Sequence, residues 1–232
     1  MISSETPYKL AEIIRDTWPQ IYSPPISVDQ SFIQNEIIYK KVILSRNECN
    51  IIANYILENE DFIKSLGPDI YPGTTENSLT GRYSIFNFLN IEKVNNILEP
   101  KLRKIFNDLK LKYPIYVQCW ANTYRKNDYI NPHKHNPNNN PNQFMSANIF
   151  LQGNVEPGTK YFFKDNVKDI KNKEGEIFIF DSTLVHSVSP YQGDETRITI
   201  AMDIHNEIEK YYSEEHCKFE YELDKIRYYK FE

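Results

Sequence analysis

Three of the chain's five histidines stand where they could share one metal ion. His133 and His135 lie two residues apart, and side chains at positions i and i+2 of an extended segment point to the same face. His186 follows a separate apolar segment, residues 176–181. Imidazole is a good ligand for iron, zinc and copper. Each histidine alone would be an ordinary loop or strand residue, but the three together predict a metal site.

Arg197 is the second residue whose position suggests chemistry. It lies eleven residues after His186 and begins the apolar segment RITIAMDI, residues 197–204. A buried guanidinium cannot lose its proton, so it needs an anionic partner. That partner is either a nearby acid, Asp194 or Glu195, or the carboxylate of a bound ligand held by two hydrogen bonds. The apolar surroundings favour the bound carboxylate.

The elements that must position these residues are short strands. Between residues 114 and 204 the sequence has five runs rich in aromatic and β-branched residues, separated by turn residues: IYVQCWANTY, FMSANIFLQ, TKYFFK, EIFIFD and TRITIAMDI. Such spacing is typical of an all-β sandwich or barrel. The Asn- and Pro-rich segment at residues 136–142 cannot pack a core, and we expect residues 136–143 to be a lid or a substrate-recognition loop.

The N-terminal half has a different pattern. Thr6 and Pro7 predict one helix start, and Ser45 with Glu48 forms a capping box that predicts another. Residues 36–44 and 82–89 read as strands, and residues 91–111 as a helix that contains Pro100. The chain is therefore predicted to be α+β, a double-stranded β-helix (jelly roll) supported by N-terminal helices. Residues 1–112 form the support region and 113–232 the jelly-roll core with a C-terminal extension, in one structural domain.

Composition excludes several classes of protein. A formal charge of −5 and a pI near 5.6 argue against a nucleic-acid partner held through its phosphates. No apolar run is long enough to span a bilayer, and the N-terminus lacks the apolar core of a secretion signal. The three cysteines are isolated from one another, which is typical of a reduced cytosolic protein. We expect a cytoplasmic protein without a membrane or nucleic-acid partner; its oligomeric state stays open.

These motifs together resemble the 2-oxoglutarate/Fe(II) dioxygenase superfamily. The likeness is greatest to its branch named "putative 2OG-Fe(II) oxygenase", which is common in bacterial and phage genomes, and the Asn-, Lys- and Ile-rich composition fits such a source. It covers roughly residues 116–204. The resemblance rests on Trp120 and Asn122, HKH at 133–135, Ser146, Gly175 followed by EIFIFDSTLVHSV, and Arg197 followed by ITIAMDI.

The resemblance implies a set of roles. Iron(II) would be bound by His133, His135 and His186, and Arg197 would bind the distal carboxylate of 2-oxoglutarate. The full implied set adds Thr199 and Tyr124 as further cofactor-binding residues and Asn122, Asn148 and Tyr161 as residues of the substrate pocket. No catalytic residue is implied beyond the metal ligands. With dioxygen, such an enzyme would hydroxylate an amino acid, a peptidyl side chain or a small metabolite.

One position departs from the family pattern. The usual iron site has two histidines and one carboxylate, but His135 occupies the place of the carboxylate. Three histidines are the favoured ligand set. The alternative is that Asp128 or Asp181 supplies a carboxylate, although Asp181 could instead orient a ligand from outside the first coordination sphere.

Two other functions stay open at this point. One is a cupin-like three-histidine metalloenzyme that does not use 2-oxoglutarate, for which Arg197 would have no purpose. The other is a non-catalytic jelly-roll binding protein or virion component.

Overall fold

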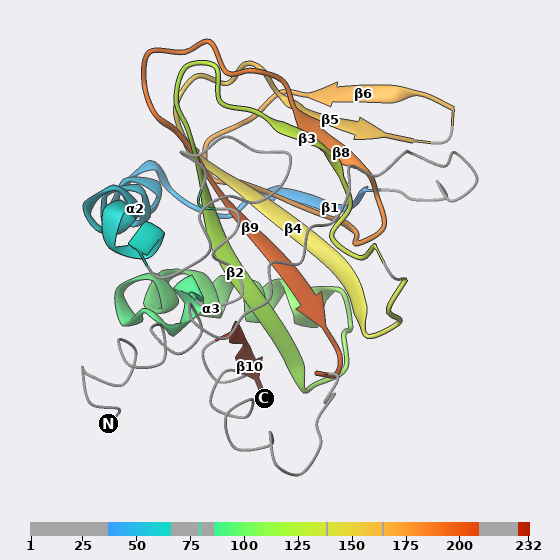
Figure 1. Cartoon of the computed structure of the whole chain (residues 1–232). Coiled ribbons are helices and arrows are strands. Elements are labelled where there is room, and N and C mark those ends of the chain that lie inside the picture. The colour runs from blue at the N-terminus through green and yellow to red at the C-terminus, as the bar shows by residue number, and fades with distance from the viewer. Residues whose placement is uncertain (1–36, 66–78, 80–85, 138, 164, 209–226) are drawn as a thin grey trace.

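A computed structural model of the chain describes residues 37–65, 79, 86–137, 139–163, 165–208 and 227–232. Two antiparallel sheets form its centre. The larger has the strand order β1-β7-β4-β9-β2-β10 and the smaller the order β3-β8-β5-β6. Figure 1 shows the short strands of the small sheet beyond one end of the long strands β2, β4 and β9. Strands that alternate between two sheets along the chain make a jelly roll, so the predicted fold class is confirmed.

The large sheet draws strands from the whole length of the described chain. Its members are β1 (Ile37–Val42), β2 (Ile115–Tyr124), β4 (Gln143–Gln152), β7 (Glu176–Asp181), β9 (Arg197–His205) and β10 (Tyr229–Phe231). The N-terminal support region thus contributes one edge strand and the last residues of the chain the other. The small sheet contains β3 (Ile130–His133), β5 (Thr159–Phe162), β6 (Val167–Ile170) and β8 (His186–Val188).

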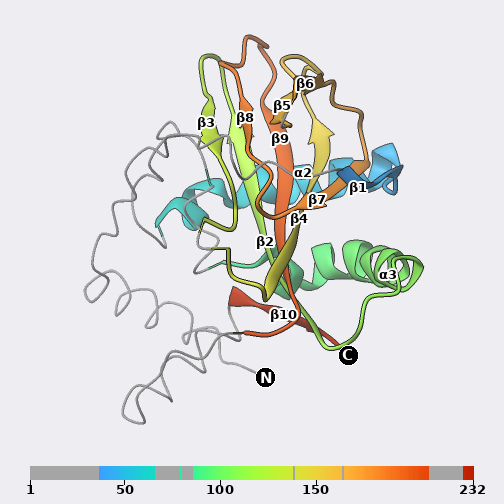
Figure 2. The same cartoon turned by 90° about the vertical axis from the view of Figure 1, so that its right-hand side faces the viewer.

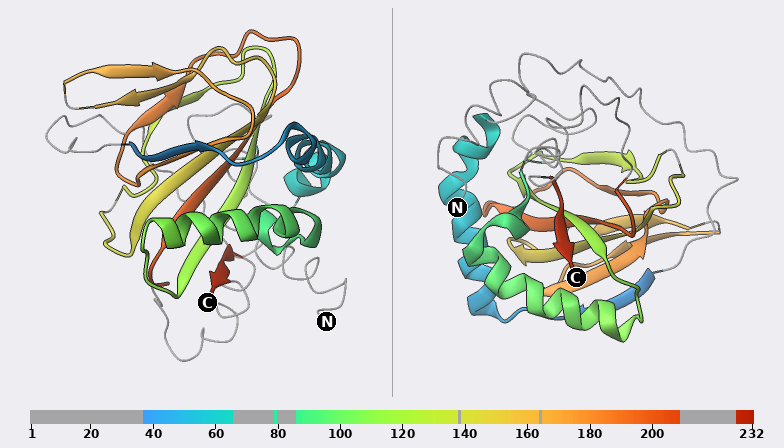
Figure 3. Two further views of the ribbon diagram at one scale, coloured as in Figure 1. Left: turned by 180° about the vertical axis from the view of Figure 1, so that it is seen from behind. Right: turned by 90° about the horizontal axis from the view of Figure 1, so that it is seen from below.

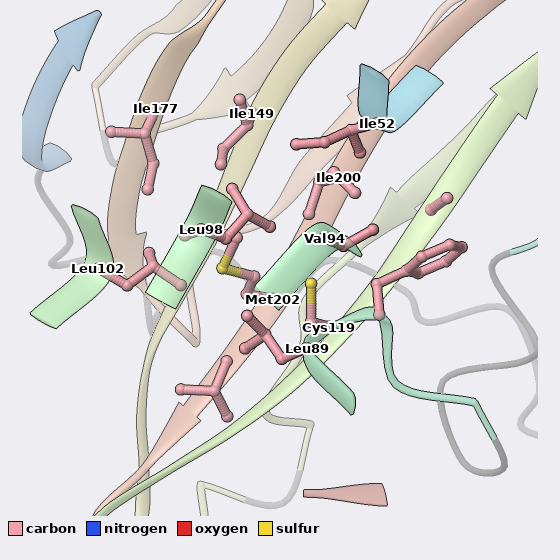
Figure 4. Close-up of a cluster of buried hydrophobic side chains, with 14 of the residues drawn as sticks. Ile52, Leu89, Val94, Leu98, Leu102, Cys119, Ile149, Ile177, Ile200 and Met202 are labelled. Carbon is pink, nitrogen blue, oxygen red and sulfur yellow. The ribbon is translucent and has the colours of Figure 1, made fainter. Parts of the chain in front are cut away.

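Two helices cover one face of the large sheet. They are α2 (Arg46–Ser65) and α3 (Glu92–Asp108), and Figure 3 shows α3 crossing this face when the molecule is seen from behind. Figure 4 shows the side chains that fill the interface: Val94, Leu98 and Leu102 of α3 and Ile52 of α2 meet Cys119, Ile149, Ile177, Ile200 and Met202 of the sheet. All of these side chains are buried, so this layer is the main hydrophobic core.

The start of α2 follows its sequence signal, and one glycine allows a close approach of two chain segments. The predicted capping box precedes α2: the Ser45 backbone N–H donates to Glu48 Oε2 at 2.8 Å, and the Glu48 N–H donates to Ser45 Oγ at 3.3 Å. Gly175 has φ +73° and lies against the Leu44 carbonyl, where a Cβ would collide. That close approach lets the Ile43 N–H donate to Gly175 O at 2.8 Å, where the chain leaves β1 beside the start of β7.

Pleating gives the two faces of the large sheet different chemistry. In β9, Ile198, Ile200, Met202 and Ile204 join the helix-covered core, whereas Arg197, Thr199 and Ala201 line a pocket on the opposite face.

Figure 2, turned by 90° from Figure 1, shows the small sheet gathered at the end of the long strands.

One sequence prediction was wrong, and others fall outside the described residues. Residues 86–89 are not strand: η3 (Phe88–Asn90) is a 3₁₀ turn. Asn87 causes this, because its Oδ1 accepts from the Leu89 N–H at 2.9 Å while its Nδ2 donates to the Val117 carbonyl at 2.7 Å. The helix start at Thr6 and residues 82–85 of the same predicted strand lie outside the described residues. Within the described part of the chain, no helix is both long and apolar enough to cross a bilayer.

Candidate metal centre and its pocket

The two sheets bring the three histidines together. His133 ends β3, His186 begins β8, and the two are direct partners in the antiparallel β3–β8 pair. Cross-strand partners place their side chains next to each other on one face, and the two ring centroids are 4.3 Å apart. His135 follows two residues after His133, with its ring 4.9 Å from that of His186. One ligand atom from each histidine lies within 4.8 Å of the other two, as a shared metal ion requires.

Hydrogen bonds fix which nitrogen of each ring is free. His133 Nδ1 contacts the Asn131 carbonyl at 2.8 Å, and His186 Nδ1 contacts the Leu184 carbonyl at 3.1 Å. A carbonyl oxygen can only accept, so both Nδ1 atoms carry the proton. The lone pair of each neutral ring is then on Nε2. Metal-binding histidines are typically held in this way by a second partner.

His135 is held by a carboxylate instead of a carbonyl. Its Nδ1 lies 2.5 Å from Asp203 Oδ1. The same oxygen accepts a hydrogen bond from Ser146 Oγ at 2.8 Å. Burial alone would raise the pKa of the Asp203 carboxyl, but the attraction of His135 and the hydrogen bonds from His135 and Ser146 outweigh burial, so that pKa lies below its ordinary value.

The surroundings keep two of the imidazoles neutral. Burial, together with the neighbouring His135, lowers the pKa of His133 to about 4. Burial, together with His133 and His135, places the pKa of His186 well below its ordinary value. A histidine must be neutral to bind a metal ion. At neutral pH these rings are therefore already in the form that a metal ligand needs.

Neither acid considered as an alternative ligand belongs to the cluster of His133, His135 and His186. Asp181 Oδ1 accepts from the Thr183 backbone N–H at 2.8 Å and from Thr183 Oγ1 at 2.6 Å, which stabilises the turn before His186. Asp128 Oδ2 accepts from the Arg125 N–H at 2.6 Å. In the described residues, the geometry therefore matches three histidines better than two histidines and a carboxylate.

Arg197 opens into the same pocket. It is 1% exposed, and its guanidinium lies 5.0 Å from the centre of the Tyr124 ring. Its Nη2 has one long contact, 3.4 Å, with Asn172 Oδ1, whereas Nε and Nη1 have no hydrogen-bond partner among the described residues. Asp194 and Glu195, the protein acids considered as partners, are exposed and form no ion pair with it in the described structure. A buried cation with unsatisfied N–H groups is costly unless an anion binds there.

The pocket joins the histidine cluster to Arg197. Tyr124, Asn122 and Thr199 line it, and Asn122 Nδ2 donates to Thr199 Oγ1 at 3.4 Å. Asn148 also lines it and donates to the Tyr161 hydroxyl at 2.6 Å. Every residue predicted for the site is thus brought to one place, although Tyr161 lies behind Asn148 and does not itself line the pocket. The other lining residues are Trp120, Ile130, His133, His135, Ala147, Thr159, Phe180, His186, Val188, Arg197 and Ala201.

The Asn-rich segment after His135 has an ordered hydrogen-bond network. Asn136 is 4% exposed, and its Nδ2 donates to the Asn140 carbonyl at 2.7 Å and to the Gln143 carbonyl at 2.9 Å. Backbone N–H groups of His135 and Asn136 both donate to the Ser182 carbonyl. These bonds anchor the start of the loop directly beside the metal-ligand candidates, so in this structure Asn136 supports His135.

Residues 149–203 match the model of the family described as "Putative 2OG-Fe(II) oxygenase". The matched stretch contains His186 and Arg197 and begins after His133 and His135. No curated protein matches the chain.

Three solved prolyl hydroxylases have a similar fold. A prolyl-4-hydroxylase from Pseudomonas putida is 16% identical, with a TM-score of 0.50 over 78% of this chain and 96% of that one. The viral collagen prolyl hydroxylase from Paramecium bursaria Chlorella virus-1, solved as a 2OG complex, is 16% identical, with a TM-score of 0.52 over 78% of this chain and all (100%) of that one. A Trichoplax adhaerens prolyl hydroxylase, in complex with a hypoxia inducible factor peptide fragment, is 11% identical, with a TM-score of 0.54 over 87% of this chain and 91% of that one.

The chain resembles the 2OG-Fe(II) oxygenases in sequence and in fold. A 2OG-dependent oxygenase is the enzyme class that these findings support, with iron(II), 2-oxoglutarate and dioxygen as its cofactor and cosubstrates. The residues present fit both bound groups of a 2OG-Fe(II) oxygenase. Two of three clustered imidazoles are kept neutral by their surroundings, and a buried guanidinium has two nitrogens, Nε and Nη1, without a partner among the described residues.

Sequence reasoning did not single out Asp203, the carboxylate that holds His135. A signal for it was present, because Asp203 shares the period-2 face of β9 with Arg197 and Thr199.

Proposed function

We propose that the chain is a hydroxylase that binds iron(II) through His133, His135 and His186 and binds 2-oxoglutarate through Arg197. The observation that carries the proposal is the position of a buried, unsatisfied guanidinium in the same pocket as three clustered histidines. When bound, iron(II) and 2-oxoglutarate supply the oxidising chemistry that inserts one oxygen atom of dioxygen into a substrate C–H bond. The chain's own residues bind and orient the reactants and exclude water.

Arg197 would form two hydrogen bonds to the distal carboxylate of 2-oxoglutarate from the adjacent nitrogens Nη1 and Nη2, of which Nη2 has a single long contact with Asn172. Thr199 and Tyr124 would assist. Thr199 Oγ1 accepts from Asn122, which leaves its hydroxyl hydrogen available for a ligand. Burial raises the pKa of Tyr124 to about 12, so its phenol stays protonated and remains a hydrogen-bond donor. Ile130, Val188 and Phe180 supply apolar walls that keep water away.

The substrate would enter beside Asn122 and Asn148, with Tyr161 behind them. These two side-chain amides, beside the histidine cluster and the apolar walls of the pocket, suit a substrate that carries one amide or carbonyl group. An amino acid, a peptidyl side chain or another small metabolite would meet this requirement. The peptide bound to the Trichoplax prolyl hydroxylase supports the peptidyl side chain among these three. We place this enzyme in the cytoplasm of a bacterium or a phage-infected cell, in keeping with its acidic pI near 5.6.

A cupin-like three-histidine enzyme without 2-oxoglutarate is disfavoured by the same guanidinium. Such an enzyme would leave Arg197 buried at 1% exposure without an anion, at an unrecovered desolvation cost. A non-catalytic jelly-roll protein would have no reason to keep both this cation and a cluster of histidines in one pocket.

The proposal is tested by uncoupled turnover. The assay needs no knowledge of the substrate, because it measures the succinate formed from 2-oxoglutarate in the presence of iron(II) and dioxygen. Wild-type protein is expected to form succinate in an iron-dependent way, and His186→Ala to form none. His205→Ala is the matched control, because His205 is also buried but lies outside the histidine cluster. Equal succinate formation by His186→Ala and wild type would contradict the proposed centre.

A further inference from the structure

Asp203 is a buried acid on the pocket side of β9 to which the proposed function gives no role. It is 6% exposed and lies in the interior of the large sheet, paired with Ser146 of β4 on one side and Gln118 of β2 on the other. A carboxylate in this environment is expensive to bury unless it is hydrogen-bonded or paired with a positive charge. The buried Asp203 carboxylate therefore requires a hydrogen-bond donor or a positive charge beside it.

One oxygen of the Asp203 carboxylate makes two hydrogen bonds. Oδ1 lies 2.5 Å from His135 Nδ1 and accepts from Ser146 Oγ at 2.8 Å. Because a carboxylate is an acceptor, His135 carries its proton on Nδ1, and its Nε2 lone pair is left for a metal ion. The other two cluster histidines, His133 and His186, are held by backbone carbonyls, so His135 alone of the three has an acidic partner.

The acidic partner of His135 matters because the pocket otherwise gathers positive charge. A divalent ion bound by three neutral imidazoles keeps its full charge of about +2, and the Arg197 cation lies in the same pocket. The usual two-histidine, one-carboxylate site offsets part of that charge with its carboxylate ligand. In this chain His135 stands in the carboxylate's place, and the nearest acid in contact with the cluster is one imidazole further out.

We infer that Asp203 is a positioning residue that supplies, through the His135 ring, the negative charge that the three-histidine centre lacks. It fixes the His135 tautomer and ring orientation, and it makes the imidazole a stronger electron donor to the metal. Ser146 supports it by holding Oδ1 in place. This inference rests on the proposed function, because it requires His133, His135 and His186 to be the metal ligands.

The test uses the full chain and Co(II) alone, without 2-oxoglutarate, with the dissociation constant measured by competition against a chelating indicator. Asp203→Asn keeps the acceptor oxygen and removes the charge, so its affinity for Co(II) is expected to fall about tenfold. Asp203→Ala removes charge and acceptor and is expected to lose up to about a hundredfold. Ser146→Ala should cause a smaller loss. Glu176→Gln, at a buried acid of the same sheet that contacts Lys40, is the control and should leave the affinity unchanged.

A purely structural role is excluded by a double-mutant cycle. If Asp203 acts through the imidazole, Asp203→Asn will weaken Co(II) binding in wild type and will cause no loss in a His135→Asp background, which keeps three ligands but has no imidazole between Asp203 and the metal ion. An unchanged Co(II) affinity in folded Asp203→Asn, or an equal loss in both backgrounds, would overturn the inference. Should Asp203→Asn fail to fold, Ser146→Ala, which keeps the carboxylate, takes its place. An unchanged Co(II) affinity in Ser146→Ala would then overturn the inference.

Failure of this inference is separable from failure of the proposed function. His186→Ala in the same assay reports on the histidine centre itself. If His186→Ala abolishes Co(II) binding while Asp203→Asn has no effect, the centre stands and only the role of Asp203 is overturned. If wild type does not bind Co(II), both proposals are overturned.

Discussion

The two faces of β9 are equally buried, and they are stabilised in different ways. Toward the helices, Ile198, Ile200 and Met202 pack into a continuous apolar core. Toward the small sheet, Arg197 and Asp203 are just as inaccessible but are charged. The apolar face is satisfied by the protein alone, whereas the polar face has N–H groups at Arg197 that the described residues leave without a partner. A strand can therefore serve as core on one side and as a ligand site on the other, and changes to the two sides should have opposite consequences.

The largest expected effect is on the polar face. His186→Ala should abolish binding of a divalent metal, because two remaining imidazoles make an incomplete site, while the free energy of unfolding of the metal-free protein changes little. Calorimetric titration with Co(II) measures the first quantity and urea denaturation the second. Retained metal affinity would show that His186 is a structural residue.

The converse change is on the apolar face. Ile200→Ala should lower the free energy of unfolding by about 2–5 kcal/mol, because it leaves a cavity between the sheet and the helices. Metal affinity of the remaining folded protein should be unaltered. Loss of metal affinity in proportion to the loss of stability would mean that the two faces are not independent.

Arg197 gives the sharpest contrast between the faces. Arg197→Met should weaken 2-oxoglutarate binding by about 2–5 kcal/mol, the usual cost of removing one partner from a buried charged pair. In the absence of ligand, the same change should leave thermal stability equal or higher, since it removes a buried cation that forms no ion pair with any acid of the described residues. Measured affinity for the metal should not change. A large loss of stability in the ligand-free protein would instead indicate a structural anion within the chain.

The effect that builds up most gradually is a dependence of stability on pH. Burial lowers the pKa of His133 to about 4 from an ordinary value of 6.5. Between these values the unfolded chain binds a proton that the folded chain does not, so the metal-free protein should lose stability as the pH falls from 6.5 towards 4. Thermal unfolding across this range measures the slope. His133→Asn should reduce the slope and leave the part that His186 contributes, and an identical slope in wild type and variant would contradict the lowered pKa of His133.

Local sequence patterns were sufficient to predict those features that depend only on neighbouring residues. The β-branched residues of the run at 197–204 predicted β9, the Ser45 and Glu48 pair predicted the start of α2, and the spacing of His133 and His135 predicted their common face. These features depend on local geometry. They could be read without knowing which strands would become neighbours.

Features that depend on tertiary contacts could not be read in this way. Phe88 and Leu89 have strand-forming residues around them, but the Asn87 side chain bonds to the backbone and a 3₁₀ turn results. Asn136 was taken for part of a low-complexity loop, yet it is buried by bonds to residues four and seven positions away. Asp203 contacts His135 across 68 positions of sequence, a pairing that only the jelly-roll topology creates.

The most direct test of the account is an anaerobic titration of the purified protein with iron(II) followed by 2-oxoglutarate, observed by visible absorption. A weak charge-transfer band from the keto acid chelated to iron should appear in wild type and in His205→Ala. It should be absent in His133→Ala, and Arg197→Met should require far more 2-oxoglutarate to reach it. Iron binding without such a band at saturating 2-oxoglutarate would contradict the use of this cosubstrate, and failure to bind iron would contradict the metal centre itself.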